Sequence, residues 1–259
     1  MLAAMLVCGA NCNASVAPDD VDSVEADSVA TPIYSGQLAV VTTPYTTDAM
    51  PRRVTNPDEL SRYFTAEEIP DSIFARMYGK SFSRKCTVPR SELRYLRLLH
   101  NDANGQTRTG EMIVNQAIAD KVLRVMRRLY EAGYRIERIE LIDNYGASDT
   151  RSIDHNNTSA FNFRTVAGTN RLSRHARGLA IDLNPFYNPY IVYKRVKGRI
   201  VPSTHRRKWA FDRDTRNDIP YKIDSEDLAV KLFLQEGFNW GGDWTSEKDY
   251  QHFDYKIPE

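Results

Sequence analysis

The apolar residues in the middle of the chain follow first a strand period and then a helix period. Residues 93–100 are typical of a strand, Asn104-Gly105 of a turn and 107–114 of a return strand, which together predict a β-hairpin. Apolar residues then recur at helical spacing over 118–129, which predicts the longest helix, with Asn115 as its cap. The hairpin and this helix are therefore the expected core of the fold.

Shorter patterns extend this picture on both sides. They predict helices at 56–60, 66–78 and 224–237, and strands at 138–144, 179–183 and 252–255. Asn56 and Asp224 are the expected caps of the first and last of these helices. Helices and strands are mixed without a βαβ rhythm, which predicts the α+β class: a small antiparallel sheet with flanking helices.

Composition and charge narrow the class of protein. Hydrophobic residues make up 41% of the 259 residues and charged residues 27%, which is typical of a soluble globular protein. The sequence has no run of eighteen apolar residues, so we expect no integral membrane span. Residues 51–259 carry 35 basic and 28 acidic side chains, a net charge of +7, which suits an anionic partner.

The first fifty residues have a different character. Met1–Cys8 is small and apolar, and Ser15-Val16-Ala17 fits a cleavage site, so 1–17 is interpreted as a signal segment. No positive charge precedes the apolar run, so either its start is truncated or the segment is not a signal peptide. The first is preferred, because residues 18–50 are typical of an exported flexible linker. We expect one domain over 51–259 and export to the periplasm or cell envelope, with lipidation at Cys8 or Cys12 as an alternative.

Two segments carry candidate chemistry: 173–182 (SRHARGLAID) and 241–255 (GGDWTSEKDYQHFDY). His175, Asp182 and His252 supply the donors of a tetrahedral zinc site, with water at the fourth position. Gly178 would let the loop turn back so that the first two face one point. Asp249 is an acid near these donors, as a general base requires. Chemistry alone leaves a zinc site and structural histidines both open.

The same segments resemble a known family. SRHARGLAID is similar to the S-x-H-x-x-G-x-A-x-D signature of zinc D-alanyl-D-alanine carboxypeptidases, and the second segment resembles that family's closing G-G-D-W…D-x-P-H-F-E stretch. The family shares its fold group with lysostaphin-type peptidases and the hedgehog signalling domain. The resemblance implies a hedgehog/DD-peptidase-like fold and one Zn²⁺ per chain on His175, Asp182 and His252. It also implies Asp249 as general base. Gln251 and Asp254 depart from the pattern, where proline and glutamate are common.

The resemblance further implies an arginine that grips a substrate carboxylate. Arg164 is preferred to Arg151 because it closes a polar stretch near the signature, although either arginine could simply lie at the surface. Ser159 and Ser173 are also expected at the substrate site, with Ser173 supporting the ligands. The function implied is hydrolysis of peptidoglycan stem peptides, as a D-alanyl-D-alanine carboxypeptidase. The alternatives are an L,D- or D,D-endopeptidase of the same family and a non-catalytic, zinc-stabilised wall-binding module.

Residues 186–216 combine nine basic residues with interleaved aromatic residues. A nucleic-acid surface would fit this composition, but an export leader argues against it, so no nucleic-acid partner is expected. Two interpretations stay open. The segment is either an insertion beside the cleft that attracts anionic wall polymer, or a solvated loop with aromatic side chains packed beneath it.

Overall fold

The computed structural model describes residues 50, 52–166, 168–202, 210 and 212–258. All of them belong to one compact unit, residues 34–259. The leader expected over 1–17, and all of the expected linker except Met50, lie outside the described residues. The Met50 backbone N–H donates to the carbonyl of Thr107, and its side chain packs against a small apolar cluster with Tyr130.

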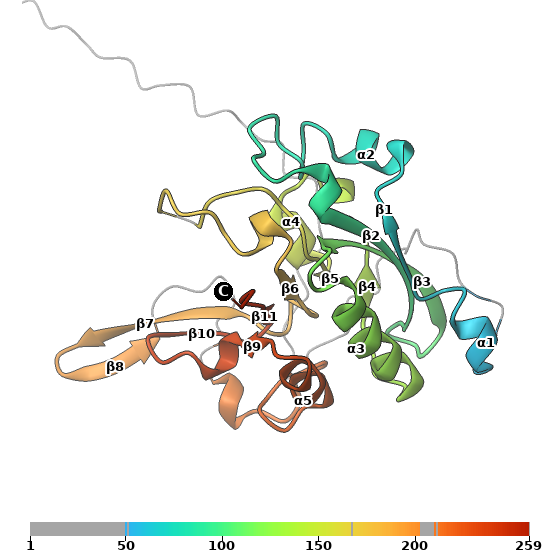
Figure 1. Cartoon of the computed structure of the whole chain (residues 1–259). Coiled ribbons are helices and arrows are strands. Elements are labelled where there is room, and N and C mark those ends of the chain that lie inside the picture. Colours follow the sequence, from blue (N-terminus) through green and yellow to red (C-terminus); the bar gives the residue numbers. More distant parts are fainter. Residues whose placement is uncertain (1–49, 51, 167, 203–209, 211, 259) are drawn as a thin grey trace, which may run out of the picture. The chain divides into compact units, whose positions relative to one another are not determined.

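The described residues mix short helices and short strands (Figure 1). The α-helices are α1 Pro57–Leu60, α2 Asp71–Met77, α3 Ala119–Glu131, α4 Asp149–Asp154 and α5 Leu228–Gln235. The strands are β1 Thr65–Glu68, β2 Leu93–Asn101, β3 Thr107–Asn115, β4 Arg138–Ile139, β5 Asn157–Thr158, β6 Ala180–Asp182, β7 Tyr190–Val196, β8 Arg199–Pro202, β9 Asn239–Trp240, β10 Glu247–Asp249 and β11 His252–Asp254. Turns of 3₁₀ helix lie at η1 Arg90–Glu92, η2 Ile142–Tyr145, η3 His175–Arg177, η5 Arg213–Thr215 and η6 Gly241–Asp243.

The strands of the described chain form several small sheets. Three antiparallel sheets have the orders β1-β2-β3, β10-β7-β8 and β6-β11-β9, and β4 pairs with β5 in parallel. The expected α+β class with small antiparallel sheets is therefore confirmed, with more sheets than the one predicted. The hedgehog-like arrangement stays a prediction.

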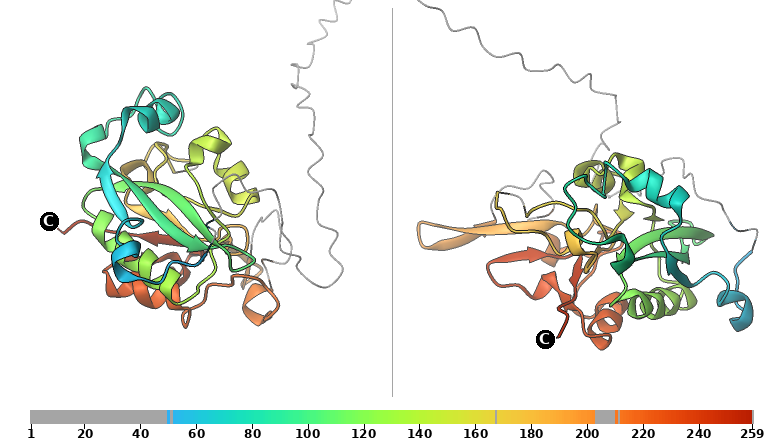
Figure 2. Two further views of the ribbon diagram at one scale, coloured as in Figure 1. Left: turned by 90° about the vertical axis from the view of Figure 1, so that its right-hand side faces the viewer. Right: turned by 45° about the horizontal axis from the view of Figure 1, so that its top comes forward.

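The hairpin and the long helix form the centre of the core, as the patterns predicted. β2 and β3 pair along their whole length, and Gly105 adopts φ +78° in the connecting turn. α3 lies along this hairpin with α5 beside it (Figures 1 and 2). The apolar face of α3 is almost wholly buried, through Val122, Val125, Met126 and Leu129. Burial of side chains of this size stabilises a fold by about 1.5–3 kcal/mol each.

Three predicted elements were wrong in extent, among them the helix expected over 224–237, which is the shorter α5. The helix expected over 66–78 is a strand, β1, followed by the shorter α2, because Pro70 disfavours helical geometry in the residue before it. The strand expected over 138–144 ends at Ile139 and gives way to a 3₁₀ turn. The side chain of Asn157 accepts a hydrogen bond from the Glu140 N–H, which would otherwise continue the ladder.

Two predicted caps were also wrong. Asn115 closes β3, and α3 begins only at Ala119. Asp227 rather than Asp224 caps α5, where its side chain accepts from the Ala229 N–H. Asn115 has another use, because its Nδ2 donates to the carbonyl of Arg177. This hydrogen bond ties the end of the hairpin to the first of the two motifs.

Candidate metal centre

Two neighbouring strands and one turn place the three predicted donors together. β6 and β11 are antiparallel, and Asp182 lies directly opposite His252, so their side chains share one face of the sheet. His175 comes from the η3 turn just before β6. Gly178 closes this turn with φ +66°, and a β-carbon there would lie 2.7 Å from the backbone N of Asn115. Only glycine therefore allows the turn to pack against β3 and return to β6.

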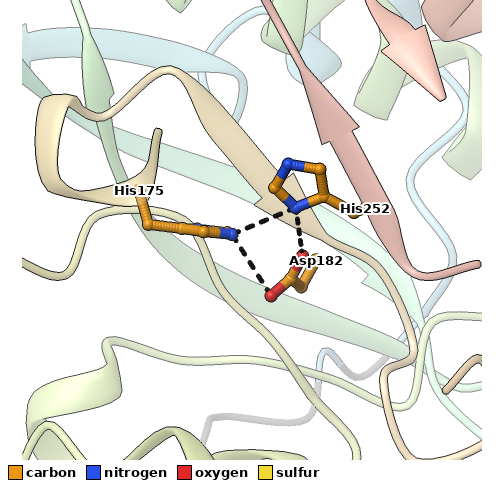
Figure 3. A group of neighbouring side chains, drawn as sticks. All are labelled: His175, Asp182 and His252. Atoms are coloured by element: carbon orange, nitrogen blue, oxygen red, sulfur yellow. Dashed lines mark hydrogen bonds and ion pairs between the residues drawn. The ribbon is translucent and has the colours of Figure 1, made fainter. Parts of the chain in front are cut away.

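The three donor atoms have the spacing of a tetrahedral site (Figure 3). His175 Nε2 lies 3.3 Å from His252 Nδ1 and 3.3 Å from one carboxylate oxygen of Asp182, and His252 Nδ1 lies 2.9 Å from the other oxygen. Two ligands at about 2.0–2.1 Å from a tetrahedral zinc ion lie about 3.3 Å apart. The nitrogen and oxygen donors present here therefore fit a zinc ion in type and in spacing.

The surroundings of His175 fix which of its ring nitrogens faces the centre. His175 Nδ1 lies 2.6 Å from the carbonyl oxygen of Ala160, so this nitrogen carries the proton and donates it, and Nε2 is left as the ligand. The ring of Trp244 packs against His252 at 5.4 Å between centroids. Both histidines are buried. The rings are thus held in place by the chain itself.

The electrostatics of the site favour a cation. Burial opposes the ionisation of Asp182, but the adjacent rings of His175 and His252 outweigh it and hold the pKa of this carboxyl well below its ordinary range. Burial likewise lowers the pKa of His252, yet the hydrogen bond and the charge of Asp182, with that of Asp249, raise it to about 9. At neutral pH the metal-free site therefore holds a proton on His252, where a metal ion would take its place.

We expect zinc binding to release this proton, because the metal needs the neutral ring. Below pH 9, each unit of acidification should weaken zinc affinity about tenfold, as one displaced proton requires. Conversely, the raised pKa stabilises the metal-free fold fully below about pH 6.5, and this contribution is lost as the pH rises through 9. Competition with a chromophoric chelator at pH 7 and pH 8 measures the slope. A zinc affinity that does not change with pH would contradict the protonated state of His252.

Asp249 lies beside the three donors without joining them. Its nearer carboxylate oxygen is 4.0 Å from His252 Nδ1, and its other oxygen, Oδ1, is buried without a hydrogen-bond partner among the described residues. Burial raises the pKa of Asp249 to about 7, and the charge of Asp182 adds to this rise, while the two histidines partly offset it. A buried carboxyl with one free oxygen and a pKa near neutrality can both take and return a proton.

The first glycine of the second motif packs against Asp249, and the second packs against the ring of Trp240. A β-carbon on Gly241 would lie 2.5 Å from the backbone oxygen of Asp249 and 2.9 Å from its Cβ. A larger residue would therefore push Asp249 away from the metal site. The signature G-G-D-W has a steric reason in this chain, because the η6 turn packs directly against the end of β10.

The two predicted serines lie next to the donors. Ser173 Oγ accepts a hydrogen bond from the backbone N–H of His175, so it supports the η3 turn. Ser159 exchanges two backbone hydrogen bonds with Asp182 and is only partly buried. The segment that contains Ser159 and Ala160 therefore forms the edge of the site beside β6. A substrate contact of either serine stays a prediction.

The two predicted arginines differ in their surroundings. Arg164 forms an ion pair with Asp149, which also accepts from the side chain of Asn162. Its backbone carbonyl accepts from the Ser173 N–H, which connects it to the first motif. Arg151 lies exposed on α4. Nothing in the sequence signalled that Arg164 has a resident carboxylate partner, nor that Ala160 supplies the carbonyl for His175.

We expect the Arg164→Ala variant to raise KM for a peptide with a free carboxyl terminus about two- to fivefold, because a partly exposed charge pair is worth up to about 1 kcal/mol. An amidated peptide, which lacks that charge, should show little change. Arg151→Ala is the matched control. Steady-state kinetics on both peptides decide the matter, since equal losses would show that Arg164 acts through Asp149 and the fold instead.

The remaining histidines stay away from this chemistry. His100 is buried, its Nδ1 hydrogen-bonds the carbonyl of Ile136, and burial lowers its pKa to about 4, so it is a neutral core residue as predicted. His155 contacts the carbonyl of Arg151 and the ring of Tyr145. His205 lies outside the described residues. No other group of metal-binding side chains was found among the residues that the structure describes.

Two histidines and one aspartate, with a further carboxylate beside them, are a donor set typical of zinc hydrolases. A family model described as D-alanyl-D-alanine carboxypeptidase matches residues 167–255, a range that contains both motifs. The match supports the resemblance that the motifs indicated: over residues 167–255 the chain is similar to this family of peptidases. No curated protein matches the chain. No solved structure matches it either.

Proposed function

We propose that this protein is an exported zinc metallopeptidase that hydrolyses peptidoglycan stem peptides, as a D-alanyl-D-alanine carboxypeptidase. One observation carries the proposal. Three donor atoms stand at zinc-ligand spacing, and the carboxylate of Asp249 lies 4.0 Å from one of them with a free, buried oxygen. The family match supports the substrate class, because its model is described as D-alanyl-D-alanine carboxypeptidase.

The residues of the site have two roles, metal binding and proton transfer. His175, Asp182 and His252 would hold the zinc ion. When bound, zinc polarises the scissile carbonyl and brings the pKa of a water molecule towards neutrality. Asp249 would take a proton from the attacking water and later give it to the leaving amine, which requires a pKa near the working pH. Burial of the site excludes bulk water and strengthens these interactions.

A non-catalytic binding module is the rival from another class. Burying a carboxylate oxygen without a hydrogen bond costs free energy, and a purely structural zinc site gains nothing from it. A structural site would also complete its coordination with a fourth side chain, whereas the group found here has three members. Both features favour the enzyme.

Mass spectrometry of purified muropeptides before and after incubation tests the proposal. We expect the loss of one terminal alanine from pentapeptide stems. Cleavage of cross-links would instead show the endopeptidase of the same family, and unchanged muropeptides in the presence of bound zinc would favour the binding module. The amidated peptides used for Arg164 provide a second check, because a carboxypeptidase should hydrolyse them far more slowly than peptides with a free terminus.

Export to the periplasm or cell envelope is part of the proposal, and it rests on the leader-like sequence of residues 1–17 and on the substrate class. Within the described ranges, no helix has the length and apolar character needed to cross a bilayer. A chain secreted with this leader would meet peptidoglycan in the compartment where the polymer is found.

A further inference from the structure

The β-hairpin of β7 and β8 continues directly from the proposed catalytic strand. The sheet order is β10-β7-β8, and Asp249, the last residue of β10, pairs with Tyr190, the first residue of β7. β7 then runs past the end of β10 and pairs with β8. Figure 1 and the right-hand view of Figure 2 show this hairpin reaching out beside β10. It is called the arm below and comprises residues 190–202.

The outer part of the arm is basic and has no acidic partner. Lys194, Arg195, Lys197 and Arg199 are all exposed, and none of them pairs with an acidic residue of the described chain. The arm itself contains no Asp or Glu. Four cations that are close together and unpaired repel one another, so this arrangement suits an anionic ligand that neutralises them.

The register of the strands divides these cations between two faces. Directly opposite residues share a face, and alternate residues along a strand share a face. Asp249 therefore shares its face with Tyr190 and Lys194. Arg199 joins them, because it pairs with Val196 on the same face of β7. Arg195 lies on the other face.

The two faces also differ in what covers them near the body. On the face opposite to Asp249, Ile191 is buried and Tyr193 packs against the main apolar cluster. On the Asp249 face, Tyr190 is 41% exposed and Val196 is 49% exposed. This face also carries Glu247, which lies opposite Val192 and accepts a hydrogen bond from the hydroxyl of Tyr190. The exposed side chains on this face therefore form a strip that begins at Tyr190, next to the buried carboxylate of Asp249, and leads along the arm to two cations.

The length of the strip indicates the length of its ligand. Lys194 is four residues from Tyr190 and Val196 is six, which correspond to about 13 Å and about 20 Å along a strand. An extended peptide covers about 3.3–3.6 Å per residue, so these distances equal roughly four to six residues. A dipeptide held at the reacting bond could not reach the cations.

We propose that the arm is an extended subsite for carboxylate-bearing wall peptide, in which Lys194 and Arg199 bind anionic groups four to six residues away from the scissile bond. This inference deepens the proposed function and rests on it for the position of the reacting bond. Stem peptides of the wall carry several free carboxylates, and a cross-linked stem is long enough to follow the strip. The substrate is accordingly polymeric or cross-linked peptide rather than a free dipeptide.

The test is a sedimentation assay with insoluble, purified wall and the zinc-loaded Asp249→Asn chain, in which turnover is blocked. Lys194→Gln and Arg199→Gln should each weaken binding about three- to fivefold, and the double variant about tenfold, as expected for exposed charge pairs. Arg195→Gln removes the same charge from the opposite face and should leave binding unchanged. Raising the salt concentration should erase the differences.

Three results would overturn the inference. They are an equal loss in Arg195→Gln, no loss in the double variant, and tighter binding to a short DNA duplex than to the wall. The assay does not depend on cleavage. If wild-type protein releases no product from the wall while sedimentation still depends on Lys194 and Arg199, the proposed hydrolysis fails and the docking role stands.

Discussion

Zinc stays bound to an Asp249→Asn variant while kcat falls by about two to four orders of magnitude, the usual size of a general-base contribution. Zinc is retained because Asp249 lies 4.0 Å from His252 Nδ1 and outside the group of three donors. The rate falls because the amide that replaces the carboxylate cannot accept the proton. Zinc content and rate have to be measured on the same purified sample, since only the combination identifies a base.

The control is Asp243→Asn, an exposed carboxylate in the neighbouring η6 turn, which should keep both zinc and rate. Loss of zinc from Asp249→Asn would make Asp249 a ligand or a support for one. Full zinc with full rate would remove it from the mechanism and leave it as part of the turn before β11.

The second large effect concerns the metal itself. His252→Ala removes a buried donor that lies within 3.3 Å of both partner donors, so zinc affinity should fall by more than about a hundredfold and hydrolysis should disappear with it. His155→Ala is the matched control, because that imidazole hydrogen-bonds only the Arg151 carbonyl and contacts the Tyr145 ring.

Metal analysis after gel filtration measures the outcome for both variants. Normal zinc content in His252→Ala would show that another side chain completes the site. An equal loss of zinc in His155→Ala would show that removing any imidazole destabilises the fold. The loss in His252→Ala could then not be assigned to a missing zinc ligand.

Local patterns were sufficient for the hairpin and α3, because both depend on residues close in sequence. They failed at 66–78 and 138–144, where Pro70 and the side chain of Asn157 decide the outcome. The first of these signals was visible in the sequence. The second was not, since Asn157 lies 17 residues away from the N–H that it occupies.

The candidate site likewise has some features that are visible in the sequence and others that depend on distant residues. The motifs identified His175, Asp182, His252 and Asp249, and the pairing of β6 with β11 explains how donors 70 and 77 residues apart meet. The partner of His175 Nδ1 is the backbone carbonyl of Ala160, an atom that every residue type carries and that no pattern can single out. The sequence of residues 190–199 does not show how this segment pairs with other strands. The face that Lys194 shares with Asp249 is therefore known only from the strand register in the structure.

The central claim is that this chain works as a zinc peptidase, and the most direct test is a zinc titration of metal-free, full-length protein. Metal content and hydrolysis of wall peptide are followed on the same samples. We predict that hydrolysis rises in proportion to occupancy and reaches its plateau at one zinc per chain, through His175, Asp182 and His252. Binding of less than about a tenth of an equivalent with no recovery on adding zinc, or full hydrolysis by the metal-free chain, would contradict the account.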